Sequence, residues 1–88
     1  MEFIVHYKVH AGQRETAQAR FSSTGAPPPD GVTMTNRWHC VHGGEGYLHC
    51  QSDDAAAIAT WIQQWSDVLD FQVTPVVGDE TMAGIIGG

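Results

Sequence analysis

Residues 32–51 read VTMTNRWHCVHGGEGYLHCQ, and this stretch decides the fold. Branched and aromatic residues on both sides of a glycine-rich turn predict two strands, residues 32–41 and 47–51, joined as a hairpin by residues 42–46. The glycines supply the positive φ angles that a tight turn requires. The segments on either side of this hairpin then determine how the sheet is completed.

A strand and a helix are predicted before the hairpin. Residues 2–10 alternate between two faces, which indicates a strand with Phe3 and Val5 directed toward the core. Residues 13–24 predict a short, weak helix, and Gly25 closes it. The prolines at positions 27–29 fix φ and lack N–H donors, so a stiff, extended connection leads into the hairpin.

A second helix is predicted after the hairpin. Ser52 or Asp53 is expected to cap it, because their side chains accept hydrogen bonds from free N–H groups in the first turn. The helix is expected to run to about Leu69. Trp61 and Trp65 lie four residues apart on its apolar face, which indicates core packing.

The chain then ends in a strand and a tail. Residues 71–77 predict the last strand, and Pro75 places this strand at a sheet edge because proline cannot donate to a ladder. Residues 81–86 are expected to form a short apolar tail. The order β-α-β-β-α-β is that of the ferredoxin-like split βαβ motif. Right-handed crossovers then give one α+β domain over residues 1–88, with an antiparallel sheet ordered 4-1-3-2 and both helices on one face.

Composition excludes several classes of protein. Of the 88 residues, 42% are hydrophobic and 16% are charged, which is typical of a globular chain. The net charge of −6 argues against a nucleic-acid partner, which would need phosphate neutralisation. The chain has no apolar run long enough to span a membrane. Residues 1–6 do not resemble an export signal, so a cytoplasmic location is expected.

The second face of the predicted sheet has no cover. Ile4, His6, Thr74 and Val76 share it, and this mixture is half apolar. Two short helices can cover only one face, and a half-apolar open face usually finds a partner. The usual partner is a second copy related by a twofold axis. We therefore expect a homodimer, and the charge split along the chain, with every Lys and Arg within the first 37 residues, can help to orient the two copies.

Four motifs stand out along the chain: Gly25-x-Pro27-Pro28-Pro29-x-Gly31-Val32, Arg37-Trp38-His39, Gly43-Gly44-x-Gly46-Tyr47 and Trp65-Ser66-Asp67-x-x-Asp70-Phe71-x-Val73-x-Pro75-Val76. Together these motifs resemble an uncharacterised bacterial family of small domains, domain of unknown function 3303, over nearly the whole chain. The resemblance implies membership of the dimeric α+β-barrel group, which includes cofactor-free monooxygenases, small isomerases, cyclases and haem-degrading enzymes. This range implies a fold and an oligomer rather than one reaction. The family usually has a larger apolar or aromatic residue at position 6 and a small apolar one at position 49, where this chain has histidines, so no family role extends to His6 or His49.

The sharpest local signal for chemistry is Arg37-Trp38-His39. Histidine can exchange a proton near neutral pH, so His39 is the candidate acid/base, and Arg37 is the candidate anion clamp. Strand alternation places Arg37 and His39 on one face and Trp38 on the other. Either face can be the one that borders a cavity, and the plain alternative is a buried structural tryptophan with two solvent-facing neighbours.

Three histidines on three strands raise a second possibility. A three-residue loop would pair His39 with His49, whereas a two-residue loop would pair Trp38 with His49, and a slip of one residue reverses the faces. In the first register His6, His39 and His49 could hold a catalytic metal ion with an open position. Their spacing matches no established ligand motif, so a metal site is the weaker interpretation, and no cofactor is implied.

The sequence therefore predicts a homodimeric barrel that binds a small, largely apolar metabolite and is a candidate cofactor-free enzyme of the monooxygenase or isomerase type, using His39. His6, Trp38, Tyr47 and His49 are the further candidates for the ligand pocket. The alternatives are a binding or assembly module without catalysis and a histidine-based metal-binding domain. The two cysteines, at positions 40 and 50, fall out of register across the hairpin and are expected to stay free and buried.

Overall fold

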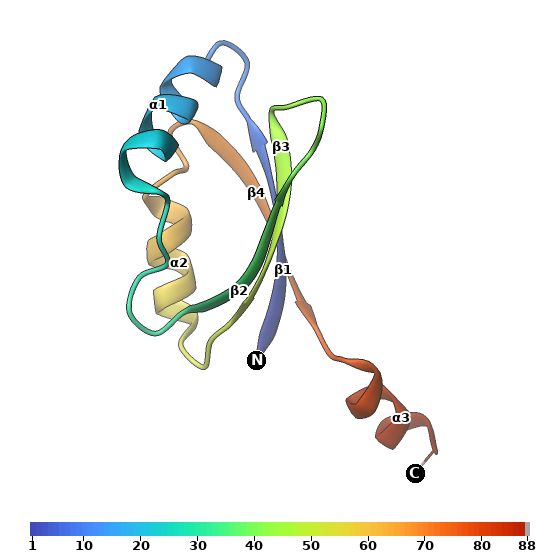
Figure 1. Ribbon diagram of the computed structural model, residues 1–88. Coiled ribbons are helices and arrows are strands. Elements are labelled where there is room, and N and C mark those ends of the chain that lie inside the picture. Colours follow the sequence, from blue (N-terminus) through green and yellow to red (C-terminus); the bar gives the residue numbers. More distant parts are fainter. Residues whose placement is uncertain (88) are drawn as a thin grey trace.

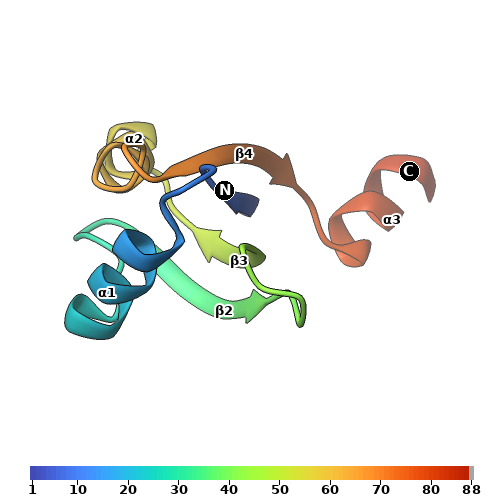
Figure 2. The ribbon, with the colours of Figure 1, turned by 90° about the horizontal axis from the view of Figure 1, so that it is seen from above.

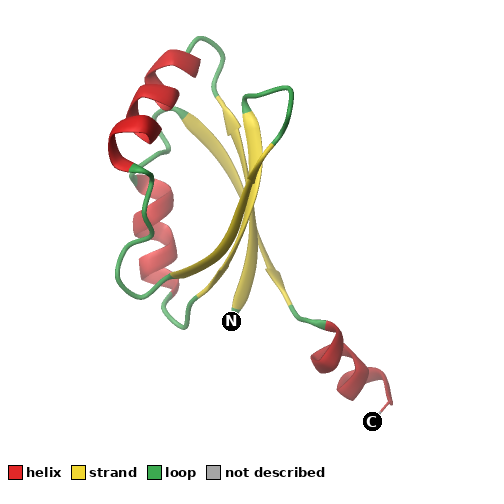
Figure 3. Cartoon of the chain, in the orientation of Figure 1, coloured by secondary structure: helices red, strands yellow, loops and turns green. Residues whose placement is uncertain are grey.

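A computed structural model describes residues 1–87 and contains the predicted order of elements plus a third helix (Figures 1 and 3). The sheet order is β2-β3-β1-β4, and every neighbouring pair is antiparallel. This confirms the ferredoxin-like fold and the edge position of β4, where Pro75 lies opposite Phe3. The elements are β1 (Glu2–Val9), α1 (Arg14–Thr24), β2 (Thr33–His39), β3 (Glu45–Gln51), α2 (Ala55–Gln63), β4 (Leu69–Val76) and α3 (Asp79–Gly87).

Helices α1 and α2 cover the same face of the sheet, as predicted (Figure 2). The helix-facing residues of β1 and β4 are those that alternation indicated, with Val5 1% exposed and Phe3, Phe71 and Val73 packed against the core. Apolar burial of this kind stabilises a fold by about 25 cal/mol per Å². The buried core consists of Val5, Ala17, Val32, Leu48, Cys50, Ala57, Ile58, Trp61, Trp65, Val68 and Leu69.

The helix ends differ in part from the prediction. Gly25 closes α1 with φ of 72°, as expected. Asp54, rather than Ser52 or Asp53, caps α2, because its carboxylate accepts hydrogen bonds from Ala56 N and Ala57 N. Ser52 is buried and instead donates a 2.6 Å hydrogen bond to the Gly31 carbonyl, which ties the hairpin end to the start of β2.

Helix α2 is also shorter than expected. It ends at Gln63, and residues 64–68 form turns that lead into β4. The apolar periodicity continues through these turns, so Trp65 and Leu69 are buried without being helical. Periodic burial therefore predicted the core correctly but overran the end of the helix.

The hairpin register is neither of the two expected. His39 pairs with Gly46, and His49 pairs with Asn36. Cys40 N donates to Glu45 O, so the turn itself spans four residues, Val41 to Gly44. The two cysteines consequently lie far apart along the hairpin, and both are free, which confirms that prediction. Cys50 is buried, but Cys40 is only half-buried.

Helix α3 replaces the predicted apolar tail. Asp79 and Glu80 occupy its first turn, where carboxylates complement the helix dipole. It projects away from the sheet (Figure 1), and Ile85 and Ile86 are 67% and 76% exposed. No helix among residues 1–87 is long and apolar enough to cross a membrane.

Candidate functional site

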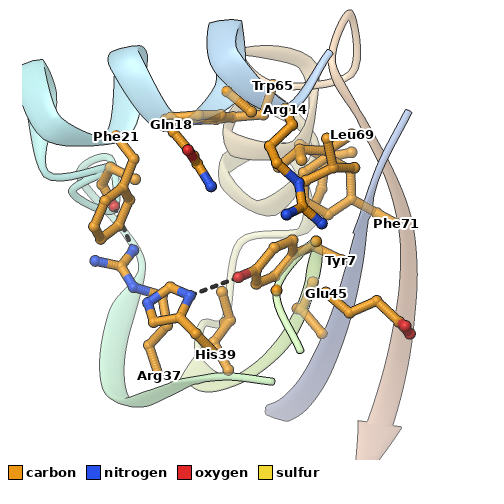
Figure 4. Close-up of a pocket in the computed structure, with 18 of the residues that line it drawn as sticks. Tyr7, Arg14, Gln18, Phe21, Arg37, His39, Glu45, Trp65, Leu69 and Phe71 are labelled. Carbon is orange, nitrogen blue, oxygen red and sulfur yellow. Dashed lines mark hydrogen bonds between the residues drawn. The ribbon is translucent and has the colours of Figure 1, made fainter. Parts of the chain in front are cut away.

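A cavity of about 420 Å³ lies between the sheet and the two covering helices. Residues of all four strands supply its floor, and α1 and α2 supply much of its wall (Figure 4). Most of the lining is aromatic or aliphatic, and the polar groups gather toward one side. The lining includes Tyr7, Arg14, Phe21, Arg37, His39, Glu45, Trp61, Trp65 and Phe71.

The polar side of the cavity is organised by one row across three strands. Tyr7 on β1 pairs with Gly46 on β3, and Gly46 pairs with His39 on β2. The Tyr7 hydroxyl and His39 Nδ1 share a hydrogen bond of 2.5 Å (Figure 4). The His39 ring also meets Phe21 edge-on, with ring centroids 5.3 Å apart. Two polar side chains that are not on neighbouring strands are thus joined inside an apolar cavity.

Gly46 makes this hydrogen bond possible. A Cβ atom at position 46 would lie 2.2 Å from Tyr7 Cε2 and 2.4 Å from the Trp38 carbonyl oxygen. The tyrosine ring therefore crosses β3 through space that any other residue would fill. Gly46 lies in β3 rather than in the turn where the sequence placed it, and it positions Tyr7 against His39.

The surroundings of Tyr7 keep its hydroxyl protonated. Burial raises the pKa of Tyr7 above the ordinary value of a phenol, and the nearby Cys40 adds to the rise, while Arg37 opposes it. Burial disfavours the phenolate because the apolar wall solvates its charge poorly. Tyr7 is thus a neutral hydrogen-bonding group at neutral pH.

Arg37 lines the cavity but is bound by the main chain. Its guanidinium donates 2.9 Å hydrogen bonds to the carbonyls of Ala26 and Gly25, and it stacks on Phe21 at 4.9 Å from the ring centroid. Burial lowers the pKa of Arg37. These contacts hold the connection after α1 against β2, and they fix the orientation of the guanidinium toward the main chain rather than toward an anion in the cavity.

A β-bulge explains why Arg37 and His39 face the cavity. The register shifts at Thr35, between the pairs Met34–Cys50 and Asn36–His49. Met34 packs against the core, and strict alternation from it would bring Trp38 inward. The extra residue reverses the alternation, so His39 points inward and Trp38 outward. Thr35 is fixed because its Oγ1 donates a hydrogen bond to the His49 carbonyl and shares a second hydrogen bond with His49 Nδ1.

The other predicted site residues lie on the opposite face of the sheet. Trp38 pairs with Tyr47, which pairs with His6, and none of the three lines the cavity. Trp38 is 52% exposed, so the interpretation of Trp38 as a buried structural residue is wrong for the single chain. His6 stacks on Tyr47 with centroids 4.8 Å apart.

The three histidines do not meet. His39 faces the cavity, whereas His6 and His49 face the opposite side, where they bond Glu45 and Glu2. Among residues 1–87 no group of three or more His, Cys, Asp or Glu side chains is arranged to hold a metal ion. The proposed trio rested on a register that pairs His39 with His49, and the longer turn removes that pairing.

Tyr7 and Arg14 are site residues that sequence reasoning missed. Alternation had placed Tyr7 on the core face, and a hydroxyl on a core face needs a polar partner, which was the available signal. Arg14 begins α1 and lies against the glycine turn at 43–44. No local pattern connects these two segments, which only the fold brings together.

A second hollow of about 790 Å³ lies at the other end of the sheet, around Met1, Gly31 and Val77. None of the predicted site residues lines it. The cavity beside His39 combines a mainly apolar lining with polar groups, which is the usual character of a ligand site.

A family model for Domain of unknown function (DUF3303) matches residues 1–88, the whole chain. The chain belongs to the DUF3303 family. No curated protein matches the sequence of this DUF3303 protein.

Two solved structures resemble the DUF3303 chain in fold. The protein Rv0793 of Mycobacterium tuberculosis has 14% sequence identity and a TM-score of 0.51, over 89% of this chain and 95% of its own. A protein of Deinococcus radiodurans, described as a candidate antibiotic biosynthesis monooxygenase, has 10% identity and a TM-score of 0.50, over 89% and 94%. At these identities the likeness concerns the fold and not the function.

Proposed function

We propose that this DUF3303 chain is a single cytoplasmic domain that forms a homodimer and binds a small, largely apolar metabolite in the cavity beside His39. The observation that carries the proposal is the cavity itself. Its volume of about 420 Å³ falls within the range of small-molecule sites. Trp61, Trp65 and Phe71 offer it an apolar wall, and the Tyr7–His39 pair lies at its polar side.

The Tyr7–His39 pair suits proton transfer. In this proposal His39 Nδ1–H donates to the Tyr7 hydroxyl oxygen, which leaves the lone pair of the neutral imidazole on Nε2. His39 Nε2 has no hydrogen-bond partner among residues 1–87 and is left for a ligand. Histidine is the residue most suited to acid/base work near neutral pH. We therefore assign His39 the acid/base role in a cofactor-free isomerase- or monooxygenase-like reaction, with Arg37 shaping the wall.

The homodimer is proposed to form through the open face of the sheet. Trp38 and Tyr47 lie side by side there, 52% and 44% exposed, next to the partly buried His6 and Ile4. Large aromatic side chains that no helix of the same chain covers favour association with a matching surface. In this arrangement His6, Trp38, Tyr47 and His49 belong to the interface, and the ligand cavity remains within each chain.

Binding is tested with 2-naphthalenemethanol, a neutral aromatic probe, and tryptophan fluorescence. Trp61 and Trp65 line the cavity, and Trp38 is replaced by Phe so that it adds no signal from the other face. The probe should quench the fluorescence in a saturable way and raise the thermal midpoint. Ala17→Leu narrows the cavity from α1 and should weaken binding, whereas Gln72→Leu on the opposite face is the control and should not. Absence of saturable quenching would overturn the proposal.

Proton transfer is tested with 2-tetralone, a carbon acid of similar size. His39 would remove a proton from the carbon beside the carbonyl, and return of a deuteron from D₂O would leave a product that NMR detects. The wild type should accelerate this exchange, and His39→Ala should remove the acceleration while the probe still binds. Binding without accelerated exchange would instead establish a binding module without catalysis.

A further inference from the structure

The mouth of the cavity carries a cation, Arg14, that has no partner among residues 1–87. Arg14 is the first residue of α1, and its guanidinium extends over the glycine turn toward the cavity (Figure 4). Its Nη1 and Nη2 atoms would lie 3.5 Å from a Cβ at Gly43, and Nη2 would lie 3.4 Å from one at Gly44. The absence of side chains on these two glycines leaves the guanidinium its place.

Within residues 1–87 Arg14 makes no hydrogen bond and no ion pair, whereas the other charged groups nearby are occupied. Arg37 is bonded to two carbonyls, and Arg20 forms an ion pair with Asp67 at 2.7 Å. Glu45 is the carboxylate that lines the cavity, but it is bonded to His6 at 2.9 Å and to His42 at 3.2 Å. Figure 4 shows the Glu45 carboxylate directed away from the cavity.

This arrangement favours one kind of ligand. Arg14 is exposed, but its guanidinium borders the apolar wall of the cavity, and a bound aromatic body would displace water from that side and strengthen the attraction to an anion. Carboxylates match its planar donors particularly well. The net charge of −6 opposes anion binding only weakly at this point, since charges more than about 8 Å away are screened at physiological ionic strength.

We infer that the ligand is an apolar organic monoanion, with a carboxylate at Arg14 and an aromatic or aliphatic body against Trp61, Trp65 and Phe71. Arg14, rather than the Arg37 that the sequence indicated, is the anion anchor. The inference rests on the proposed ligand cavity and adds the charge of the ligand to it. A ligand seated in this way extends from the mouth toward Tyr7 and His39, which also line the cavity.

Two probes with the same ring test the charge. 2-Naphthoate carries a carboxylate, and 2-naphthalenemethanol is its neutral counterpart. In the Trp38→Phe background, naphthoate should bind about tenfold or more tightly than the alcohol, as expected for a hydrogen bond to a charged group. Arg14→Gln should remove this preference by lowering the affinity for naphthoate to about that for the alcohol.

Lys8→Gln is the matched control. It removes the same charge from an exposed residue on the opposite face, so the naphthoate preference should persist. If Lys8→Gln and Arg14→Gln lose the naphthoate preference equally, the preference depends only on the net charge of the protein, and the inference is overturned. If the alcohol binds as well as naphthoate, the anion anchor is wrong while the cavity stands. If neither probe binds, the proposed function itself fails. Circular dichroism confirms that each variant is folded.

Discussion

Gly46 lies where the Tyr7 ring crosses the sheet, between the two polar groups of the site. On either side of it, β1 and β2 supply Tyr7 and His39 in one cross-strand row. At this position the backbone and the ring of Tyr7 leave no room for a Cβ. The geometry of the Tyr7–His39 pair therefore depends on a glycine, which has no side chain that could take part in the chemistry of the site.

Gly46→Ala should destabilise the fold and separate the pair. The new methyl group has to displace both a ring and a backbone carbonyl, and overpacking of this kind costs about 1–3 kcal/mol. Urea denaturation measures the loss. Gly78→Ala is the control, because its Cβ meets nothing within 4 Å and should change stability by less than about 0.5 kcal/mol. Equal stability of the two variants would contradict the packing described here.

Ionisation of Tyr7 should lower the stability of the fold at alkaline pH. Burial raises the pKa of Tyr7 in the folded chain, so its contribution is complete below the ordinary phenol pKa of about 10 and is lost as the pH rises through the folded value. Tyr7→Phe has no group to ionise and should lose less stability than the wild type between about pH 9 and pH 12. Urea denaturation across this range makes the comparison. Tyr47→Phe, on the exposed face, should keep the wild-type alkaline loss, and if it behaved like Tyr7→Phe the interpretation would fail.

Helix α1 is attached to the domain by few contacts. Ala17 is its one buried residue, and the partly exposed Phe21 borders the cavity. Arg20 compensates by donating two hydrogen bonds to Asp67 and one to the Gln64 carbonyl, which links α1 to the turns that follow α2. Because α1 forms one wall of the cavity, this link also bears on the shape of the site.

Asp67→Asn should weaken the domain at neutral pH but not in acid. The hydrogen bond from Arg20 lowers the pKa of Asp67, so its contribution is present above the ordinary carboxyl pKa of about 4 and is lost as the pH falls through the folded value. The wild type and the variant should therefore differ at about pH 7 and converge below about pH 3. Denaturation at both pH values measures the difference, with the exposed Asp30→Asn as the control. A gap that persists in acid would mean that the ion pair is not its cause.

The whole molecule is more extended than its length requires. The radius of gyration is 14.5 Å, against about 12 Å for a compact chain of this size. Helix α3 accounts for the excess, since it projects from β4 and buries none of its residues (Figure 1). Its exposed isoleucines add to the apolar surface that the open sheet face already presents.

Light scattering should find a dimer of about 19 kDa, which is two chains of 9.6 kDa. Trp38→Glu places a charge in the centre of the open face and should give a monomer, because a buried charge without a partner is strongly unfavourable. Val41→Glu introduces the same charge in the hairpin turn, where Val41 is fully exposed, and should remain dimeric. A wild-type monomer at micromolar concentration, or a dimeric Trp38→Glu, would overturn the proposed interface.

Local pattern determined the architecture of this protein. Period-two alternation identified β1 and its buried face, the glycine-rich turn identified the hairpin, and Pro75 placed β4 at the edge. These features follow from backbone geometry and side-chain burial within a few residues of each position, so they can be predicted without knowledge of the tertiary structure. The end of α2 was missed because the apolar periodicity continues beyond the last helical residue. The helix α3 was missed because its apolar pattern is too short to indicate a helix.

The site was decided by tertiary structure. Arg37 and His39 were recognised as candidates, but the bulge at Thr35 determines that they face the cavity. The position of a bulge depends on how two strands pair and on the turn that joins them. One unpaired residue then reverses the face on which every later side chain of the strand lies. Tyr7 contacts His39, and Arg14 lies against the glycine turn, although the residues of each pair are distant in sequence. Only the folded sheet with its covering helices brings them within reach.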